Sequence, residues 1–447
     1  MGVTINEVGA INEVRATSEV GRSAMRKALW RIVPLIALAY LCAYTDRVNV
    51  GFAAARMNAD LGFSATVYGL GGGLFFLGYA LFEVPSNLMA VRYGSRVWLA
   101  RIMITWGLLS AAMMFVSTPG QFYTVRFLLG VAEAGFYPGV IFYFSHWFPA
   151  CHRGRAVSRF YVASPLSSVL LGAVSGWLLA LDGTAGLRGW QWLFLVQGLP
   201  SVLVGLLVWR FLPERPADAA WLNDAEKCWI DGELAREQAQ IGDPRHDGLL
   251  AALSNQRVLQ LGALGLLLIG AITTLILNAP LVLTSATGLS TGTVGWIVSF
   301  GGLLGAGVMI WAGNSADRRN SRFPDALVYS VLLTLAFVVL ALSPSAAVTV
   351  AAYLVFATAC FAIPMLTSSG WAELLSVREL AVGAAAINTL SQIGAFVTPF
   401  AWGVLKDASG DFRAGLLLLA GLSLSLTLML WQLCRQLRLR PGIALAA

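Results

Sequence analysis

The sequence predicts an all-α polytopic membrane protein with twelve transmembrane helices arranged as two pseudo-symmetric six-helix bundles. Of the 447 residues, 57% are hydrophobic and only 12% are charged, about half the charged share of a soluble globular protein. The mean hydropathy is +0.73, and apolar blocks recur at roughly twenty residues, the length a helix needs to cross a bilayer. These observations exclude a soluble globular protein and a disordered chain. The roughly ten-residue alternation of a membrane β-barrel does not occur.

The apolar blocks form two sets of six around the longest polar stretch, residues 213–256. They lie near 29–50, 66–90, 97–116, 122–148, 157–181 and 190–212, and then near 258–284, 292–314, 324–343, 346–371, 380–405 and 412–434. We therefore expect a first bundle over 29–212, a linker over 213–256, a second bundle over 257–434, and polar tails over 1–28 and 435–447. The linker is expected to be a solvated tether with one short helix.

Basic residues gather in alternate loops, which predicts the orientation of the chain. They occupy the amino-terminal tail, the loops after the second, fourth and eighth spans, and the carboxyl tail, whereas 117–121 and 285–291 carry none. Cytoplasmic loops of membrane proteins carry an excess of Lys and Arg. We expect both termini and the linker in the cytoplasm, in a plasma (bacterial inner) membrane, with the first span directing insertion.

The two halves carry related loops after their second spans. Residues 313–322 follow the pattern G-x-x-x-D-R-x-x-x-R, with Asp317 and Arg318 at its centre, and Arg92 lies 226 residues before Arg318. Transporters are often built from two parallel six-span halves, and a duplicated loop would fit that plan, with Arg92, Asp317 and Arg318 as gate or loop residues. The simpler alternative is that these residues are ordinary basic anchors beside the membrane.

Four charged residues lie well inside the first and fourth spans, where a charge costs roughly 2.5–3.5 kcal/mol and normally faces a cavity or a partner. Asp46 and Arg47 are neighbours, so they point about 100° apart on a helix and one can meet a different helix from the other. Arg126 and Glu133 share one face of the fourth span. We expect Asp46, Arg47 and Glu133 to face a shared, water-filled chamber. The alternatives are an interfacial Asp46–Arg47 pair and a purely structural pair on Glu133.

The remaining polar candidates differ between the halves. Glu83 follows Tyr79 by one turn, near the expected cytoplasmic end of its span, and is expected to act in a gate or to anchor a loop. The second half offers uncharged polar side chains, which suit a polar ligand or hold helices together: Ser369, Trp371, Asn388 and Gln392. Cysteines and histidines lack ligand spacing, so we expect no metal and no cofactor, only a proton as coupling ion.

Three stretches carry a family resemblance: YTDRVNVGFA at 44–53, FEVPSNL at 82–88 and GVAEAGFYPG at 130–139. With the twelve-span plan and the 313–322 loop, they resemble the major facilitator superfamily and, within it, the anion:cation symporter family. That family includes bacterial proton-linked carriers of sugar acids, tartrate, phthalate and hydroxyphenylacetate. The resemblance covers nearly the whole chain.

The resemblance implies a role for each matching residue. It makes Asp46 and Glu133 the proton-coupling residues, Arg47 the ligand of the substrate carboxylate, and Arg126 the charge partner of the acids. Further substrate contacts map onto Tyr44, Tyr79, Ser164, Ser369 and Asn388. Ser164 stands where sugar-acid members carry a longer amide, which weighs against a sugar acid.

These features together predict a secondary transporter, not an enzyme, that imports a small organic carboxylate by proton symport. The expected partners are the organic anion, protons and the lipid bilayer, with no nucleic acid, and the protein is expected to be a monomer. The main alternative is proton-antiport efflux of a drug or metabolite, which Arg47 and Arg126 oppose because an efflux cavity is expected to be apolar. A polytopic membrane enzyme and a membrane sensor are more distant alternatives.

Overall fold

The structure, a computed structural model, describes residues 19–241, 255–319, 322–343, 345–375 and 377–438. Regular secondary structure in these ranges is helical, with short 3₁₀ turns at Met113–Phe115, Thr184–Gly186 and Pro216–Asp218. The helices are α2 (Glu19–Arg31), α3 (Val33–Leu61), α4 (Ala65–Tyr93), α5 (Ser95–Ala112), α6 (Pro119–Glu133), α7 (Phe136–Ser145), α8 (Ala150–Tyr161), α9 (Ala163–Ala180), α10 (Gly189–Phe211), α11 (Asp224–Ile241), α13 (Gln256–Thr287), α14 (Thr291–Arg319), α15 (Arg322–Leu342), α16 (Ala346–Leu374), α17 (Val377–Ser409) and α18 (Arg413–Arg438).

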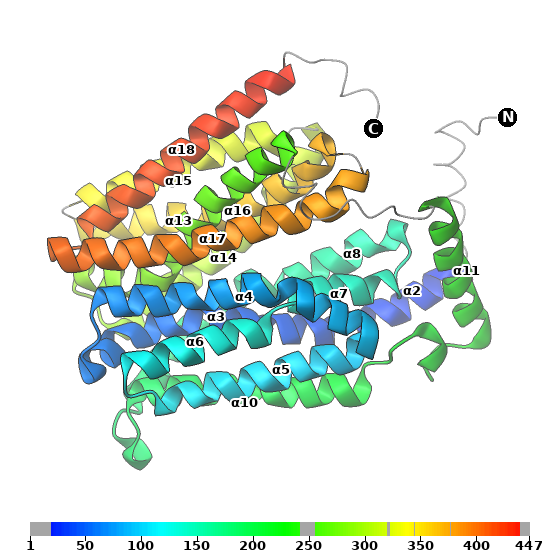
Figure 1. Ribbon diagram of the computed structural model, residues 1–447, viewed down its shortest axis with the longest axis horizontal. Helices are drawn as coiled ribbons and strands as arrows, with labels where there is room; N and C mark the ends of the chain where they lie inside the picture. Colours follow the sequence, from blue (N-terminus) through cyan, green and yellow to red (C-terminus); the bar gives the residue numbers. More distant parts are fainter. Residues whose placement is uncertain (1–18, 242–254, 320–321, 344, 376, 439–447) are drawn as a thin grey trace.

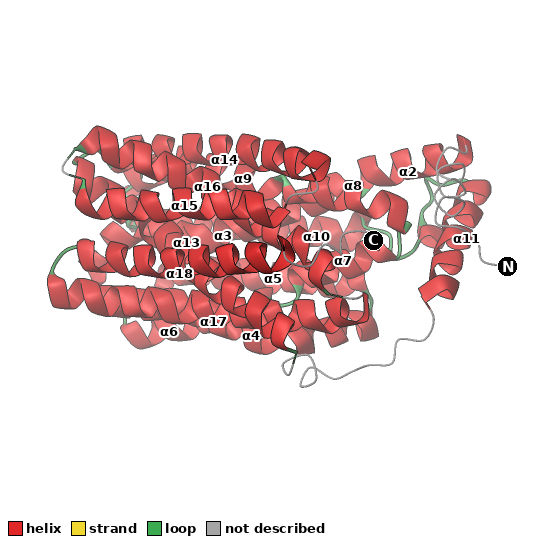
Figure 2. Ribbon diagram, turned by 90° about the horizontal axis from the view of Figure 1, so that it is seen from above, coloured by secondary structure: helices red, strands yellow, loops and turns green. Residues whose placement is uncertain are grey.

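The long helices lie nearly parallel in two layers, with α3 to α10 in one and α13 to α18 in the other (Figure 1). The helix α11 crosses one end of this arrangement (Figure 2), which we call the linker end; the opposite end is the far end. Within the described residues, eleven helical segments are long and apolar enough to cross a membrane. The expected span 380–405 lies in α17, which is not among the eleven, so a count of twelve stays a prediction.

The first span is longer than its sequence predicts. It was expected over 29–50, whereas α3 runs over Val33–Leu61 and ends at Gly62, whose φ of 65° is left-handed. The polar run around Asp46 and Arg47 lowers the local hydropathy and suggests an early end. The structure instead places both residues in the middle of α3, away from either end of the helix.

The two layers contact each other through small residues in their far halves. A Cβ atom on Gly69 of α4 would clash with the carbonyl of Pro399 in α17, and one on Gly172 of α9 would clash with the carbonyl of Gly295 in α14. Small residues let membrane helices approach at backbone distance. The far halves of α4 and α9 are thus closed against the second layer.

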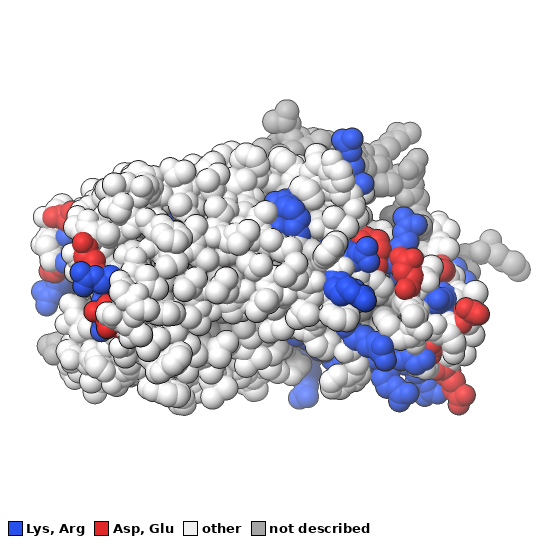
Figure 3. Space-filling view, turned by 90° about the horizontal axis from the view of Figure 1, so that it is seen from below, with Lys and Arg blue, Asp and Glu red and all other residues white. Residues whose placement is uncertain are grey.

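The surface matches a chain that spans a bilayer. Large apolar side chains such as Trp177, Trp296 and Trp311 are 63–65% exposed, which in a soluble protein would be a liability. On the face shown in Figure 3, most charged residues lie at the two ends of the molecule, and the surface between them is almost uncharged.

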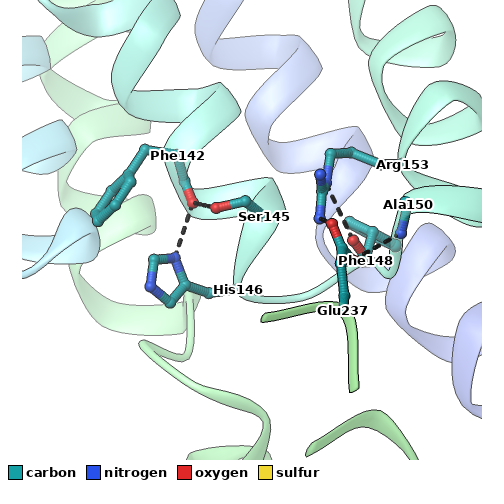
Figure 4. A network of polar contacts seen from close by, with 7 residues as sticks. All are labelled: Phe142, Ser145, His146, Phe148, Ala150, Arg153 and Glu237. Atoms are coloured by element: carbon teal, nitrogen blue, oxygen red, sulfur yellow. Dashed lines mark hydrogen bonds and ion pairs between the residues drawn. The ribbon is translucent and has the colours of Figure 1, made fainter. Parts of the chain in front are cut away.

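The first part of the linker packs against the first layer, so the expected solvated tether is wrong for these residues. Trp221 stacks on Trp147 with ring centres 5.6 Å apart. Glu237 of α11 accepts from Arg153 Nη2 at 2.8 Å and from the Ala150 backbone N–H at 3.0 Å, at the start of α8 (Figure 4). Residues 242–254 lie outside the described ranges.

A second carboxylate ties α11 to α2. Glu226 accepts from Lys27 Nζ at 2.8 Å and from Ser23 Oγ at 2.7 Å. Burial acts to raise the pKa of Glu226, but hydrogen bonds from Lys27, the Asn223 backbone and Ser23 outweigh it, so this pKa lies below its ordinary value of 4.5. Glu226 is therefore charged and docked at neutral pH.

Candidate functional site

The middle of α3 carries an ion pair with α6. Arg47 donates from Nε to Glu133 Oε1 at 2.6 Å, and its Nη2 lies 2.5 Å from the same oxygen. The Glu133 side chain is 1% exposed and the Arg47 side chain 19%, so the carboxylate is shielded while the guanidinium keeps an open edge. Within the described residues, Glu133 Oε2 has no hydrogen-bond partner. The pair therefore leaves one buried carboxylate oxygen available to a proton.

Asp46 is adjacent to Arg47 but contacts different helices. Its Oδ1 accepts from Ser110 Oγ at 2.8 Å, and its Oδ2 accepts from Trp106 Nε1 at 2.9 Å and Ser201 Oγ at 3.0 Å. These donors belong to α5 and α10 of the same layer. The expectation that Asp46 shares a chamber with Arg47 and Glu133 is wrong in this structure, because the 100° step per residue turns Asp46 into its own layer.

The fourth predicted span breaks directly after Glu133. The helix α6 ends there, Gly135 adopts a left-handed φ of 84°, and α7 starts at Phe136. Pro138 lies in the first turn of α7, a position that proline tolerates. The expected single face from Arg126 through Glu133 therefore stops at the break. The glycine and proline in GVAEAGFYPG are the signal that sequence reasoning missed, and discontinuous helices often form the binding sites of transporters.

Arg126 does not take the pairing role expected of it. Its Nε donates to the Gly71 carbonyl at 3.3 Å, and its guanidinium carbon lies 5.0 Å from the ring centre of Phe75. Arg126 is 1% exposed, and within the described residues its Nη2 has no hydrogen-bond partner. Arg126 and Glu133 are separated by two turns of α6, about 10 Å, whereas Arg47 reaches Glu133 directly from α3.

Aromatic rings of α4 surround the guanidinium of Arg47. Its central carbon lies 5.0 Å from the ring centre of Tyr79 and 5.9 Å from that of Phe75, distances at which a cation is attracted to a ring face. Tyr44 lies one turn before Arg47 on α3 and packs edge-on against Tyr40. Of the two predicted contacts, Tyr79 thus lies against the guanidinium of the ion pair, whereas Tyr44 packs on Tyr40 one turn away along α3.

The second layer reaches the first through Asn388. Its Nδ2 donates to both carboxylate oxygens of Glu83, at 2.8 and 2.7 Å. Gln392 lies one turn further along α17, and within the described residues its Oε1 has no hydrogen-bond partner. Glu83 and Asn388 therefore bridge the two layers, as a gate residue would.

Other predicted contacts lie apart from the ion pair. Ser369 is exposed near the linker end of α16, and its carbonyl accepts from Arg322 Nη1 at 2.9 Å. Trp371 is partly buried two residues further on, and Ser164 of α9 is 2% exposed. The structure shows no contact of these three side chains with Arg47 among the described residues.

The loop residues lie where the sequence places them, at the ends of α4 and α14. Arg92 is exposed with its guanidinium carbon 5.6 Å from the ring centre of Tyr93, and Arg318 is exposed in the last turn of α14. The side chain of Asp317 lies outside the described part of the structure. These contacts neither support nor contradict a gating role.

A small apolar cavity lies between the layers beside the ion pair. It has a volume of about 30 Å³ and includes Val48 and Phe52 of α3, Ser168 of α9, and Phe356 and Cys360 of α16 among its lining residues. Ligand pockets usually have volumes of about 300–1,000 Å³, so this cavity is too small for an organic acid. This cavity is therefore not the expected water-filled chamber, which stays a prediction.

Comparisons with known proteins agree on a family. A model of the Major Facilitator Superfamily matches residues 36–399. A protein of Agrobacterium vitis named "Putative tartrate transporter" is 41% identical over 410 residues, covering 91% of this chain and 90% of its own. A quinolone resistance transporter of Acinetobacter baumannii is 37% identical over 399 residues, covering 89% and 92%.

The fold agrees with solved structures as well. The xylose transporter XylE of E. coli, in a partially occluded inward open conformation, matches with a TM-score of 0.72 at 16% identity, covering 91% of this chain and 98% of its own. At that identity the match concerns the fold alone.

Proposed function

The chain belongs to the Major Facilitator Superfamily, and from that premise we propose that it imports a small organic carboxylate by proton symport. It is a membrane transporter and not an enzyme. The observation that supports the symport proposal is the ion pair in the middle of α3. A permanent cation, Arg47, is neutralised by a buried carboxylate, Glu133, which keeps one oxygen unbonded.

The ion pair suggests how a proton and an anion exchange places. A proton that binds Glu133 Oε2 removes the charge that holds Arg47. The guanidinium is then free to bind the substrate carboxylate through charge-assisted hydrogen bonds, the strong class that arginine favours. Once the substrate is bound, its carboxylate replaces Glu133 as the counter-charge of Arg47, which ends the cost of an unpaired buried cation.

Coupling requires that the carrier reorient only when both ligands are bound or both are absent. A ligand shifts a conformational equilibrium only by its differential affinity for the two states. We place Asp46 as the second protonation site. Its carboxylate joins α3 to α5 and α10, so its protonation would loosen the contacts that fix α3 within its layer.

We propose tartrate and related hydroxy or dicarboxylic acids as the first substrates to test, with aromatic acids and sugar acids next. The A. vitis relative supports this class. Asn388 and Gln392 supply amide groups that suit hydroxyls and a second carboxylate. We further propose a monomer in the bacterial inner membrane, with both termini and the linker in the cytoplasm.

Efflux by proton antiport is the second candidate function. It is favoured by the relative from A. baumannii, which is named for quinolone resistance, and by the apolar lining of the small central cavity. The two functions differ in direction and in ligand. Uptake driven by an inward proton gradient supports symport, whereas gradient-driven extrusion of an apolar drug supports antiport.

The deciding experiment is uptake of labelled L-tartrate into proteoliposomes with an imposed inward proton gradient. We expect the wild type to accumulate tartrate, Glu133→Gln to exchange tartrate across the membrane without accumulating it, and Arg47→Ala to do neither. Glu233→Gln, at a residue that pairs with Arg236 inside α11, serves as the matched control and should behave like the wild type. Accumulation by Glu133→Gln against the gradient would show that the coupling assignment is wrong.

A further inference from the structure

Glu83 uses its whole carboxylate to hold a residue of the opposite layer. Both of its oxygens accept from Asn388 Nδ2, at 2.8 and 2.7 Å. Glu83 is 9% exposed, so water does little to weaken this bridge. An amide group that faces both oxygens of a carboxylate is also the arrangement expected for an amide that binds a carboxylate ligand.

This bridge lies beside the ion pair. Glu83 follows Tyr79 by four residues, so both side chains lie on one face of α4, and the Tyr79 ring has the Arg47 guanidinium carbon 5.0 Å from its centre. Arg47, Tyr79, Glu83 and Asn388 therefore form a continuous path from α3 across α4 to α17. Asn388, a predicted substrate ligand, already binds a carboxylate that belongs to the protein.

We propose that Glu83 is an internal competitor of the substrate: its carboxylate occupies the substrate's place on Asn388, and the incoming carboxylate must displace it. The inference rests on the proposed function, because it requires a carboxylate substrate. Displacement breaks the bridge between α4 and α17. Substrate binding and separation of the two layers at the linker end thus become one event.

The contacts on the far side of α4 explain why only the linker end would separate. A Cβ atom on Gly73 would clash with the Phe396 carbonyl. At the start of α4, Asp407 of α17 accepts from the backbone N–H groups of Ala65 and Thr66 at 2.9 and 2.8 Å. Glu83 lies ten residues beyond Gly73, about 15 Å along the helix, so its bridge can break while these contacts persist.

The inference also makes Glu83 a determinant of specificity. The negative charge of Glu83 beside Asn388 repels an approaching anion but does not repel a neutral ligand, an example of selection by a repulsive element. Glu83→Gln removes the charge and keeps the shape and one acceptor oxygen. Glu83→Gln should therefore change the affinity for an acid and leave the affinity for the corresponding neutral amide unchanged. If the bridge were purely structural, the substitution would not distinguish the two ligands.

The test measures binding of L-tartrate and of its neutral diamide to the purified full-length protein by isothermal titration calorimetry. We expect Glu83→Gln to lower the Kd for tartrate by about tenfold, as expected when a nearby like charge is removed, and to leave the response to the diamide unchanged. Asp407→Asn is the matched control, because Asp407 also joins α17 to α4 but lies at the far end; it should leave both unchanged.

Hydrogen exchange of the α4 segment 83–93 gives a second readout. Tartrate should speed exchange there in the wild type and in Asp407→Asn, while Glu83→Ala should exchange fast without tartrate and respond no further. If the wild type binds tartrate and Glu83→Gln binds it equally or more weakly, the inference is wrong and the proposed function stands. If neither protein binds tartrate or any other carboxylate, both are wrong.

Discussion

Asp46 and Arg47 are consecutive in the chain and belong to two separate polar networks. Asp46 accepts hydrogen bonds from α5 and α10 inside its own layer, whereas Arg47 pairs with Glu133 at the broken end of α6. Two consecutive residues of α3 thus belong to networks around two different carboxylates, those of Asp46 and Glu133, which do not contact each other. Variants of the two residues should fail in different ways, the first in stability and proton coupling and the second in ligand binding.

Asp46→Asn should destabilise the protein. The carboxylate of Asp46 accepts from Ser110, Trp106 and Ser201, and an asparagine would turn an amide N–H₂ toward one of these donors. The cost of a buried polar group left unsatisfied is about 1–3 kcal/mol, which should appear as a lower thermal unfolding temperature in detergent. Asn49→Ala removes one weaker donor to Asp46, at 3.3 Å, and should cost less. Equal stability of Asp46→Asn and the wild type would contradict the network.

Arg47→Lys should weaken transport while the protein still folds. Lysine keeps the charge, but its single ammonium cannot present the planar fork of arginine or stack on Tyr79 in the same way. We expect the KM for the transported acid to rise by about tenfold or more, as for the loss of roughly 1.4 kcal/mol of binding, with a smaller change in the maximal rate. Arg155→Lys, at an exposed arginine of α8, is the control. A KM that does not change would remove Arg47 from the substrate site.

The sequence predicts reliably that the chain spans a membrane and which polar residues lie inside its spans. It predicts less reliably which side chains these polar residues contact. Length and hydropathy locate most spans, and the high cost of a buried charge singles out Arg47 and Glu133. It does not predict that Arg47, and not Arg126, pairs with Glu133. That choice depends on how α3 and α6 are rotated and shifted against each other, which neither helix encodes alone.

A hydropathy pattern also does not predict two other features, the helix break at Gly135 and the docking of α11. The break at Gly135 lies inside an apolar block, where only backbone conformation distinguishes one helix from two. The docking of α11 depends on single contacts, such as Trp221 on Trp147, between segments far apart in the chain. The charge composition of the linker predicts a solvated segment, whereas a few specific contacts hold α11 against the first layer.

Gly135→Ala should impair the α6–α7 break. The φ of 84° disfavours any residue with a Cβ, and that Cβ would clash with Ser86 Oγ of α4. We expect a stability loss of about 1–2 kcal/mol from the backbone conformation alone, together with slower transport, because Glu133 ends α6 at this point. Thermal unfolding and proteoliposome uptake measure the two effects.

Two further variants separate strain from the clash at Gly135. Ser86→Gly in the background of Gly135→Ala removes the side chain that is struck and leaves the φ unchanged, so it should restore part of the stability. Gly154→Ala, where a Cβ inside α8 meets nothing within 4 Å, should not destabilise and should stabilise by up to about 1 kcal/mol. Full stability of Gly135→Ala alone would mean that the break is not strained.

Docking of α11 onto α2 should depend on pH through Glu226. Lys27, the Asn223 backbone and Ser23 lower the pKa of this carboxyl in the docked state, against the opposing effect of burial. The contribution of Glu226 to the free energy of docking is therefore complete above the ordinary pKa of about 4.5. The contribution is lost as the pH falls through the lowered pKa. A fluorophore on the exposed Cys228 of α11, in a Cys151→Ser background, should therefore lose anisotropy at acidic pH.

Glu226→Gln should abolish this pH step and leave the label mobile at every pH, since the amide cannot form an ion pair with Lys27. Glu233→Gln is the matched control, because Glu233 pairs at 2.6 Å with Arg236 inside α11 itself and should leave the step in place. A step that persists in Glu226→Gln would show that the pH dependence does not come from Glu226. Transport measured over the same pH range would then show whether α11 must stay docked while α3 and α6 exchange the proton.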